Sequence, residues 1–218
     1  MEQNKVIHKG WDWKNINSET WNTVSAEFLP VSIDWAGKFH SMIDIGAGKG
    51  RHSFFMNKMG LSVAAVDLSE SSVEIIRQKN QEQGCSVEVF QSDMTELPFA
   101  DNQFDCAICF HTIYHTNLDG LVKSIEEIKR VLKSDGEVFI TFNSKDNDSF
   151  KNGESVDNYT IYKTGGIENG IPHSYIDFDD LSWIMKGFKL IKVQQIRNFV
   201  YKEEPVGGNH YYVLARKL

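Results

Sequence analysis

The chain has 218 residues, of which 41% are hydrophobic and 24% charged, and its formal net charge is −7. That length and composition suit a single domain, residues 1–218, with a sizeable core. The negative charge supplies no broad attraction for nucleic acid phosphates or acidic lipid surfaces. No run approaches the roughly 18 apolar residues of a membrane-spanning helix, and the N-terminus is polar. We therefore expect a cytoplasmic protein that binds neither nucleic acid nor membrane, in an oligomeric state that the sequence leaves open.

The N-terminal segment, residues 1–40, is rich in tryptophan. Its four tryptophans are Trp11, Trp13, Trp21 and Trp35. The pattern ahead of Pro30 predicts a helix from Ser18 to about Leu29. The indole rings either anchor this segment to the rest of the protein or form an apolar, cation-binding wall of a pocket. Trp11 and Trp13 are the better pocket candidates because they lie in the least regular stretch.

A glycine-rich turn follows the first predicted strand. A short apolar run ends at Asp44, and Gly46, Gly48 and Gly50 come next. Glycine adopts positive φ and has no Cβ, so such a turn lets backbone N–H groups approach a ligand closely. The amphipathic run 51–59 predicts the helix that follows. The spacing G-x-G-x-G differs from the dinucleotide fingerprint G-x-G-x-x-G, so the surrounding motifs have to decide which ligand the loop binds.

Acidic residues follow the next two predicted strands. The run 61–66 predicts a strand that ends in Asp67, where a carboxylate can accept hydrogen bonds from both hydroxyls of a ribose. The run 86–91 predicts a third strand, and Asp93 after it is placed to accept a hydrogen bond from an exocyclic amine such as that of adenine. The glycine loop and the two acids together indicate a ligand that contains a nucleoside.

Strand and helix patterns continue to alternate along the chain. Ser69 is the predicted N-cap of a helix that ends before Gly84. The other predicted elements are a helix over 121–132 and strands over 104–110 and 137–142. Such alternation gives a mostly parallel sheet covered by helices on both faces. The last two predicted strands, 188–200 and 210–216, have no room for a crossover helix between them, so we expect an antiparallel hairpin.

The motifs keep the order of a known enzyme family. They are Ile-Asp-Ile-Gly-Ala-Gly-Lys-Gly, Val-Asp67-Leu-Ser, Ser-Asp93-Met, Leu-Pro-Phe, Phe104-Asp105 and Arg130-Val-Leu-Lys-Ser-Asp-Gly-Glu-Val. Over roughly residues 40–143 this order resembles the class I S-adenosylmethionine-dependent methyltransferases, especially their small-molecule branch. The resemblance implies a three-layer, Rossmann-like α/β fold with a mostly parallel seven-stranded sheet and a C-terminal antiparallel hairpin.

The resemblance also implies S-adenosylmethionine as cofactor, S-adenosylhomocysteine as its product, and direct in-line methyl transfer to a small-molecule acceptor. The residues expected at the cofactor are Asp44, Gly46, Ala47, Gly48, Gly50, Asp67, Leu68, Asp93, Met94 and Phe110. The glycines would surround the methionine part, with Asp44 near its amino group. Asp67 would bind the ribose and Asp93 the adenine, with Met94 packed near the base. The segment 1–40 would act as a helical lid.

Residues 143–177 are too long for an ordinary connection between a strand and a helix. Their aromatic and histidine content favours an ordered insertion on the substrate side. His173 lies in this insertion, and His115 follows the fourth predicted strand, on the acceptor side of the resembled family. We predict that both histidines bind the acceptor or remove its proton. The alternative is that each histidine only ties down its own loop.

No metal site is predicted. The acidic residues of the insertion lack the spacing of a calcium loop, and His111 and His115 straddle a loop instead of sharing a helix. Cys106 and Cys109 spell C-x-x-C within a predicted strand, where positions three apart face opposite sides of the sheet. We therefore interpret the two cysteines as core residues.

Two other classes of protein share some of these features. A catalytically silent module that binds S-adenosylmethionine or a partner would fit, because every strong motif concerns the cofactor. A nicotinamide oxidoreductase would share the ribose-binding Asp67 but would carry G-x-G-x-x-G and would leave Asp93 unexplained. Binding without turnover would indicate the first class, and binding of a nicotinamide cofactor the second.

Overall fold

The computed structural model describes residues 6–8, 10–16, 21–164, 168–199 and 205–218. The helices and strands are, in chain order, η1 (Trp13–Asn15), α1 (Leu29–Ala36), β1 (Ser41–Ile45), α2 (Arg51–Lys58), β2 (Ser62–Asp67), α3 (Glu70–Gln83), β3 (Glu88–Gln91), β4 (Phe104–Cys109), α4 (Leu118–Val131), β5 (Leu132–Ser144), α5 (Asp148–Asn152), β6 (Thr160–Tyr162), β7 (Pro172–Ile176), η4 (Phe178–Asp180), α6 (Leu181–Ile184), β8 (Phe188–Phe199) and β9 (Pro205–Lys217). Among the described residues, no helix is long and apolar enough to cross a membrane.

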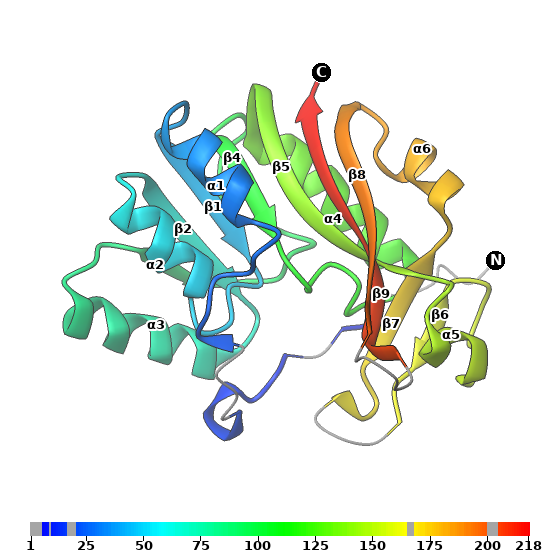
Figure 1. Ribbon diagram of the computed structural model, residues 1–218. Helices are drawn as coiled ribbons and strands as arrows, with labels where there is room; N and C mark the ends of the chain where they lie inside the picture. The colour runs from blue at the N-terminus through cyan, green and yellow to red at the C-terminus, as the bar shows by residue number, and fades with distance from the viewer. Residues whose placement is uncertain (1–5, 9, 17–20, 165–167, 200–204) are drawn as a thin grey trace.

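The central sheet has the predicted topology (Figure 1). Five parallel strands lie in the order β3-β2-β1-β4-β5. β9 pairs antiparallel with β5, and β8 pairs antiparallel with β9. These seven strands are the expected mostly parallel sheet with its C-terminal antiparallel hairpin. The carboxyl ends of the parallel strands therefore meet at one edge, where a ligand of an open α/β sheet binds.

Hydrophobic side chains pack on both faces of the sheet and form three layers. Helices α4 and α6 contribute to the core on one face, and α1, α2 and α3 contribute to the core on the other. Ile43 and Met42, neighbours in β1, belong to opposite cores, as the alternation of side chains in a strand requires. Cys109 and Cys106 are divided in the same way, and burial raises the pKa of both thiols. Both cysteines are core residues, as predicted.

Local capping sets the ends of the helices beside the sheet. The Ser69 hydroxyl accepts a hydrogen bond from the Ser72 N–H at the start of α3, and Gly84 ends that helix with φ of 62°. The Asn117 side chain accepts from the Gly120 N–H at the start of α4. These contacts satisfy helix groups that would otherwise lack a partner, which is why the sequence predicted α3 closely.

The insertion 143–177 contributes two strands that the sequence did not predict. β7 pairs with the end of β5, Asn143 opposite Tyr175, and β6 pairs antiparallel with β7. Asn143 also pairs with His210 of β9, so β7 must occupy the other edge of β5. β4 pairs with that edge of β5 as far as Ile140, which lies opposite Cys109 of β4. β7 therefore continues the sheet just beyond the carboxyl end of β4.

The predicted helix from Ser18 to Leu29 is wrong. Residues 18–20 lie outside the described part of the chain, and residues 22–28 form turns and irregular backbone without α-helix. The α-helix begins at Leu29, with Pro30 in its first turn. A first-turn residue donates no intrahelical hydrogen bond, so the missing N–H of proline costs nothing there. Pro30 starts a helix instead of ending one.

Candidate functional site

The glycine loop between β1 and α2 has the conformation that only glycine adopts easily. Gly46, Gly48 and Gly50 have φ of 70°, 55° and 78°. A Cβ added to Gly46 would lie 2.1 Å from the Thr112 side chain, and one added to Gly48 would lie 2.7 Å from the Trp13 ring. Both distances are shorter than atomic contact allows. The first two glycines thus let the loop approach the residues across the pocket, whereas Gly50 is the N-cap residue of α2.

Asp67 at the end of β2 is fixed by the backbone around it. Its two oxygens accept hydrogen bonds from the Gly48 N–H at 2.8 Å and the Ser69 N–H at 2.9 Å. Burial, opposed by these hydrogen bonds, raises its pKa. Asp44 in β1 accepts a hydrogen bond from the Ser53 hydroxyl at 2.5 Å, and burial raises its pKa to about 6. Asp67 lines the pocket, whereas Asp44 is not part of its lining.

The pocket continues past β3. Leu68, Asp93 and Met94 line it on this side. One Asp93 oxygen accepts hydrogen bonds from the Thr95 N–H and hydroxyl, both at 2.8 Å, while the other lies 2.7 Å from His8 Nε2. His8 belongs to the N-terminal segment, so this contact connects that segment to Asp93, the acid that follows β3.

Three tryptophans of the N-terminal segment form one wall of the pocket. The Trp11 and Trp13 rings stack with centroids 5.3 Å apart, and Trp21 packs edge-on against both at 5.7 and 5.6 Å. The backbone N–H of Trp13 donates a hydrogen bond to the Ser71 hydroxyl at 2.9 Å, which fixes the segment to the start of α3. Trp35, in contrast, is a core residue with no exposed surface. Trp11 and Trp13 therefore line the pocket, as predicted, and Trp21 lines it with them.

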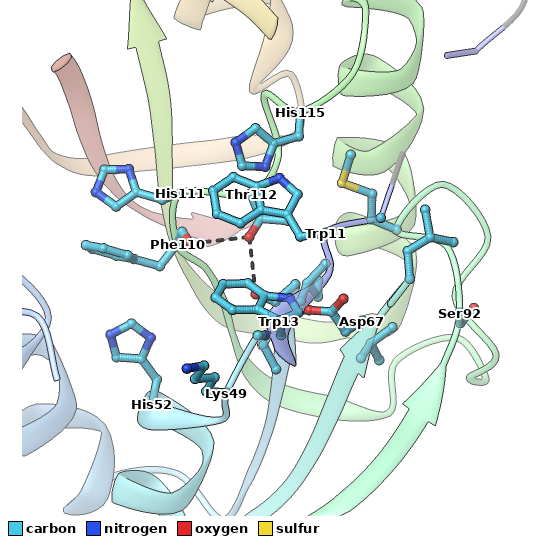
Figure 2. Close-up of a pocket in the computed structure, with 18 of the residues that line it drawn as sticks. Trp11, Trp13, Lys49, His52, Asp67, Ser92, Phe110, His111, Thr112 and His115 are labelled. Atoms are coloured by element: carbon cyan, nitrogen blue, oxygen red, sulfur yellow. Dashed lines mark hydrogen bonds between the residues drawn. The ribbon is translucent and has the colours of Figure 1, made fainter. Parts of the chain in front are cut away.

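The opposite side of the pocket follows the end of β4 (Figure 2). The Trp11 ring lies 5.3 Å from the ring of His115. His111 has φ of 53°, and its Nδ1 lies 2.9 Å from the Tyr114 hydroxyl. Burial lowers the pKa of His111 well below its ordinary value and that of His115 to about 4. Both rings are therefore neutral at pH 7.

His173, the second predicted catalytic residue, lies in β7 and is only 1% exposed. Its ring centroid is 4.7 Å from that of His115, but it does not line the pocket. Glu168 lies near both rings, with its Oε1 3.6 Å from His115 Nε2 and 3.4 Å from His173 Nε2. The two histidines were predicted from the sequence and Glu168 was not, because nothing in the spacing of the insertion indicates that it turns back toward β4.

The pocket is lined by residues of the N-terminal segment, the glycine loop and the ends of β2, β3 and β4. The predicted residues that line it are Gly46, Ala47, Gly48, Asp67, Leu68, Asp93, Met94, Phe110 and His115. The predicted residues outside its lining are Asp44, Gly50 and His173. Lining residues that the sequence did not indicate include His8, Arg51, His52 and Thr112. Of these, Arg51 and His52 follow the glycine loop directly, and their position at the start of α2 was the available signal.

Comparison with known proteins identifies the class. Residues 43–140 match the family model described as a methyltransferase domain. The fold is that of solved S-adenosylmethionine-dependent methyltransferases, including one from Clostridium acetobutylicum with a TM-score of 0.67, 16% identity and coverage of 94% of this chain and 93% of that one. Residues 43–140 are thus similar to a methyltransferase domain, and the chain shares the fold of these enzymes.

Individual relatives are similar over part of the chain. An uncharacterized methyltransferase YcgJ of Bacillus subtilis is 34% identical over 98 residues, 44% of this chain and 38% of the relative. A sarcosine/dimethylglycine N-methyltransferase of Aphanothece halophytica is 36% identical over 103 residues, 46% of this chain and 36% of the relative. The chain therefore spans less than two fifths of the length of these relatives. A Burkholderia thailandensis 1,6-didemethyltoxoflavin-N1-methyltransferase, solved with S-adenosylhomocysteine bound, has a TM-score of 0.65 at 20% identity, with 91% and 81% of the two chains covered.

Proposed function

We propose that the protein transfers a methyl group from S-adenosylmethionine to a small-molecule acceptor. The observation that carries this proposal is the convergence of the glycine loop, Asp67 and Asp93 on one pocket, from the ends of three adjacent parallel strands. In that arrangement Asp67 accepts hydrogen bonds from the ribose hydroxyls and Asp93 binds the adenine, with Met94 beside the base. The methionine part would bind along the glycine loop, which lacks Cβ atoms at Gly46 and Gly48 and so packs closely against Thr112 and Trp13.

Asp44 and Gly50 serve the cofactor indirectly in this proposal. Asp44 holds Ser53 of α2, and Gly50 allows the sharp entry into that helix. Both contacts fix the loop that carries Gly46 and Gly48. The cofactor supplies the electrophilic methyl group, so the protein's contribution is alignment and the exclusion of water.

We place the acceptor beyond the end of β4, among Phe110, Trp11 and His115. The buried Trp11 Nε1 has no hydrogen-bond partner among the described residues. A polar acceptor atom would satisfy this donor, because a buried N–H without a partner is costly. Neutral His115 faces the acceptor and binds it or takes its proton. His173 does not line the pocket and contacts the His115 ring. The names of the two N-methyltransferase relatives agree with a small acceptor.

We propose that Trp11, Trp13 and Trp21 of the N-terminal segment cover this pocket, and that the insertion 143–177 closes the acceptor side through β7, within one domain of residues 1–218. The function is tested in two steps. Calorimetry should show that S-adenosylmethionine and S-adenosylhomocysteine bind and that NAD does not. Incubation with a labelled methyl donor and a metabolite extract should then yield a labelled small molecule. Binding without turnover would leave a silent cofactor-binding module, and labelling of RNA, DNA or protein alone would overturn the acceptor class.

A further inference from the structure

We propose that His115, Glu168 and His173 form a binding site for a divalent transition-metal ion, for which Zn²⁺ is the best match. Each residue offers one ligand atom, and the three atoms lie within 4.8 Å of one another. Two imidazole nitrogens and one carboxylate oxygen are a ligand set that binds Zn²⁺ and leaves a coordination position open. This inference goes beyond the proposed methyl transfer and does not depend on it.

The hydrogen bond of His173 determines which of its ring nitrogens is free. His173 Nδ1 lies 3.1 Å from the Ile171 carbonyl oxygen, and a carbonyl can only accept, so Nδ1 carries the proton. In the neutral ring, Nε2 then presents a lone pair toward Glu168 Oε1, itself an acceptor, at 3.4 Å. Two acceptors face each other inside the protein. A cation between them removes this conflict, and the Ile171 carbonyl supplies the second hydrogen bond typical of a metal-bound histidine.

The distances from Glu168 to the two histidines favour a metal site over a direct ion pair. A charge-assisted hydrogen bond between a histidine and a carboxylate spans about 2.7–2.9 Å. Glu168 Oε1 lies 3.4 Å from His173 Nε2 and 3.6 Å from His115 Nε2, and neither nitrogen has a hydrogen-bond partner among the described residues. Ligands bonded at about 2.0–2.1 Å in a tetrahedron stand about 3.4 Å apart. The two spacings to Glu168, 3.4 and 3.6 Å, are close to that tetrahedral edge.

The backbone holds the two histidines in place without a metal. The Ser174 N–H, next to His173, donates to the carbonyl of Tyr114, next to His115, at 2.8 Å. The His115 N–H donates to the Thr112 carbonyl at 2.9 Å. The Glu168 side chain is 30% exposed, which gives an ion access from solvent. The ligands therefore come from a fixed pair of segments and one reachable carboxylate.

The site adjoins the methyltransferase pocket, because His115 lines that pocket and packs against Trp11 (Figure 2). The open coordination position suits an oxygen, nitrogen or sulfur atom of the acceptor. A bound cation lowers the pKa of such a group and stabilises its deprotonated form. With a metal bound, the two histidines are ligands of the metal, and the metal contacts the acceptor. The histidines then do not themselves take a proton from the acceptor.

Zn²⁺ titration of the wild-type protein by calorimetry tests the site, without cofactor or acceptor. We expect one equivalent to bind with micromolar or tighter affinity and to raise the melting temperature. His173→Gln and Glu168→Gln should each weaken binding at least about a hundredfold. His210→Gln is the matched control, since His210 is a neighbouring histidine whose ring lies 5.7 Å from Tyr114 but which contributes no ligand. Its Zn²⁺ affinity should stay within about threefold of wild type.

Substitution with Co²⁺ should give the visible absorption of a tetrahedral ion in the wild type and in His210→Gln only. Melting of each metal-free variant shows whether it is folded. The proposal is overturned if the folded wild type binds no Zn²⁺, or if folded His173→Gln and Glu168→Gln bind it as tightly as the wild type. Equal loss in His210→Gln would also overturn it, since the ion would then bind elsewhere. None of these outcomes depends on methyl transfer, so the two proposals can fail separately.

Discussion

The Gly48 N–H donates a hydrogen bond to the Asp67 carboxylate across 2.8 Å, so the glycine loop after β1 and the acid at the end of β2 form one rigid unit. The same carboxylate accepts from the Ser69 N–H at the start of α3. Since both backbone donors fix its orientation, Asp67 is oriented before any ligand arrives. Preorganisation of this kind lowers the entropy that binding has to overcome.

Replacement of Asp67 tests the ribose contact. Asp67→Ala should weaken S-adenosylmethionine binding by about 1–3 kcal/mol, because the ribose hydroxyls lose their acceptor. Isothermal titration calorimetry measures the change. Asp34→Ala, at an exposed position of α1, should leave the affinity unaltered. Equal affinities of wild type and Asp67→Ala would remove Asp67 from the cofactor site.

Gly48 should tolerate no side chain, because an added Cβ would meet both backbone strain and the Trp13 ring. Gly60 serves as a control for the backbone strain alone. Gly48→Val would force φ of 55° on a branched residue and place its Cβ 2.7 Å from the Trp13 ring. Gly60, with φ of 97°, has nothing within 4 Å of an added Cβ. Gly60→Val should therefore show backbone strain of about 1–2 kcal/mol in denaturant unfolding and normal cofactor affinity. A folded Gly48→Val protein should show both a larger loss of stability and weaker cofactor binding; unchanged affinity would refute the assignment of the loop.

Asp44 should make the stability of the free protein depend on pH. Its pKa is raised from 3.8 to about 6, so the folded state binds more protons than the unfolded state between these values. The stability contributed by protonated Asp44 is complete below pH 4 and is lost as the pH rises through 6. Relative to Asp44→Asn, wild type should therefore lose up to about 3 kcal/mol between pH 4 and pH 7. Urea unfolding at both pH values measures this, and a constant difference between the two proteins would be incompatible with the raised pKa.

Trp11 should matter to the acceptor more than to the cofactor. Trp11→Ala opens the wall between Trp13 and His115, so turnover should fall at least tenfold, about 1.4 kcal/mol in the barrier, with cofactor affinity nearly constant. Trp183→Ala, which removes a 43% exposed tryptophan from α6, serves as the control. Deletion of residues 1–16 should reduce methyl transfer more than it reduces cofactor affinity. Parallel losses of affinity and turnover would indicate a cofactor contact instead.

His115 should likewise be needed after cofactor binding. His115→Gln keeps a polar side chain of similar length but lacks the imidazole that faces the acceptor. We expect turnover to fall at least about tenfold and S-adenosylmethionine affinity to stay within about threefold. His40→Gln, at an exposed position before β1, is the control. Normal turnover in His115→Gln would leave alignment and desolvation as the protein's whole contribution.

The sequence predicts the cofactor half of the pocket because its signals are local. Gly46, Gly48 and Asp67 sit at strand ends whose order follows from the alternation of strands and helices, and parallel strands bring those ends together. The acceptor half depends on long-range pairing. Glu168 reaches His115 only because β7 pairs with the end of β5, and no residue spacing predicts that register. The misplaced helix near Pro30 has another cause, since a proline fits both the end of one helix and the start of the next.

The most direct test of the central claim is mass spectrometry of the products formed from isotope-labelled S-adenosylmethionine, the purified protein and a metabolite extract. We predict one labelled small molecule that gains a single methyl group, formed together with an equal amount of S-adenosylhomocysteine. The mass of that molecule would also identify the acceptor. The claim would be contradicted if the protein formed no S-adenosylhomocysteine under these conditions and bound neither S-adenosylmethionine nor S-adenosylhomocysteine in calorimetry.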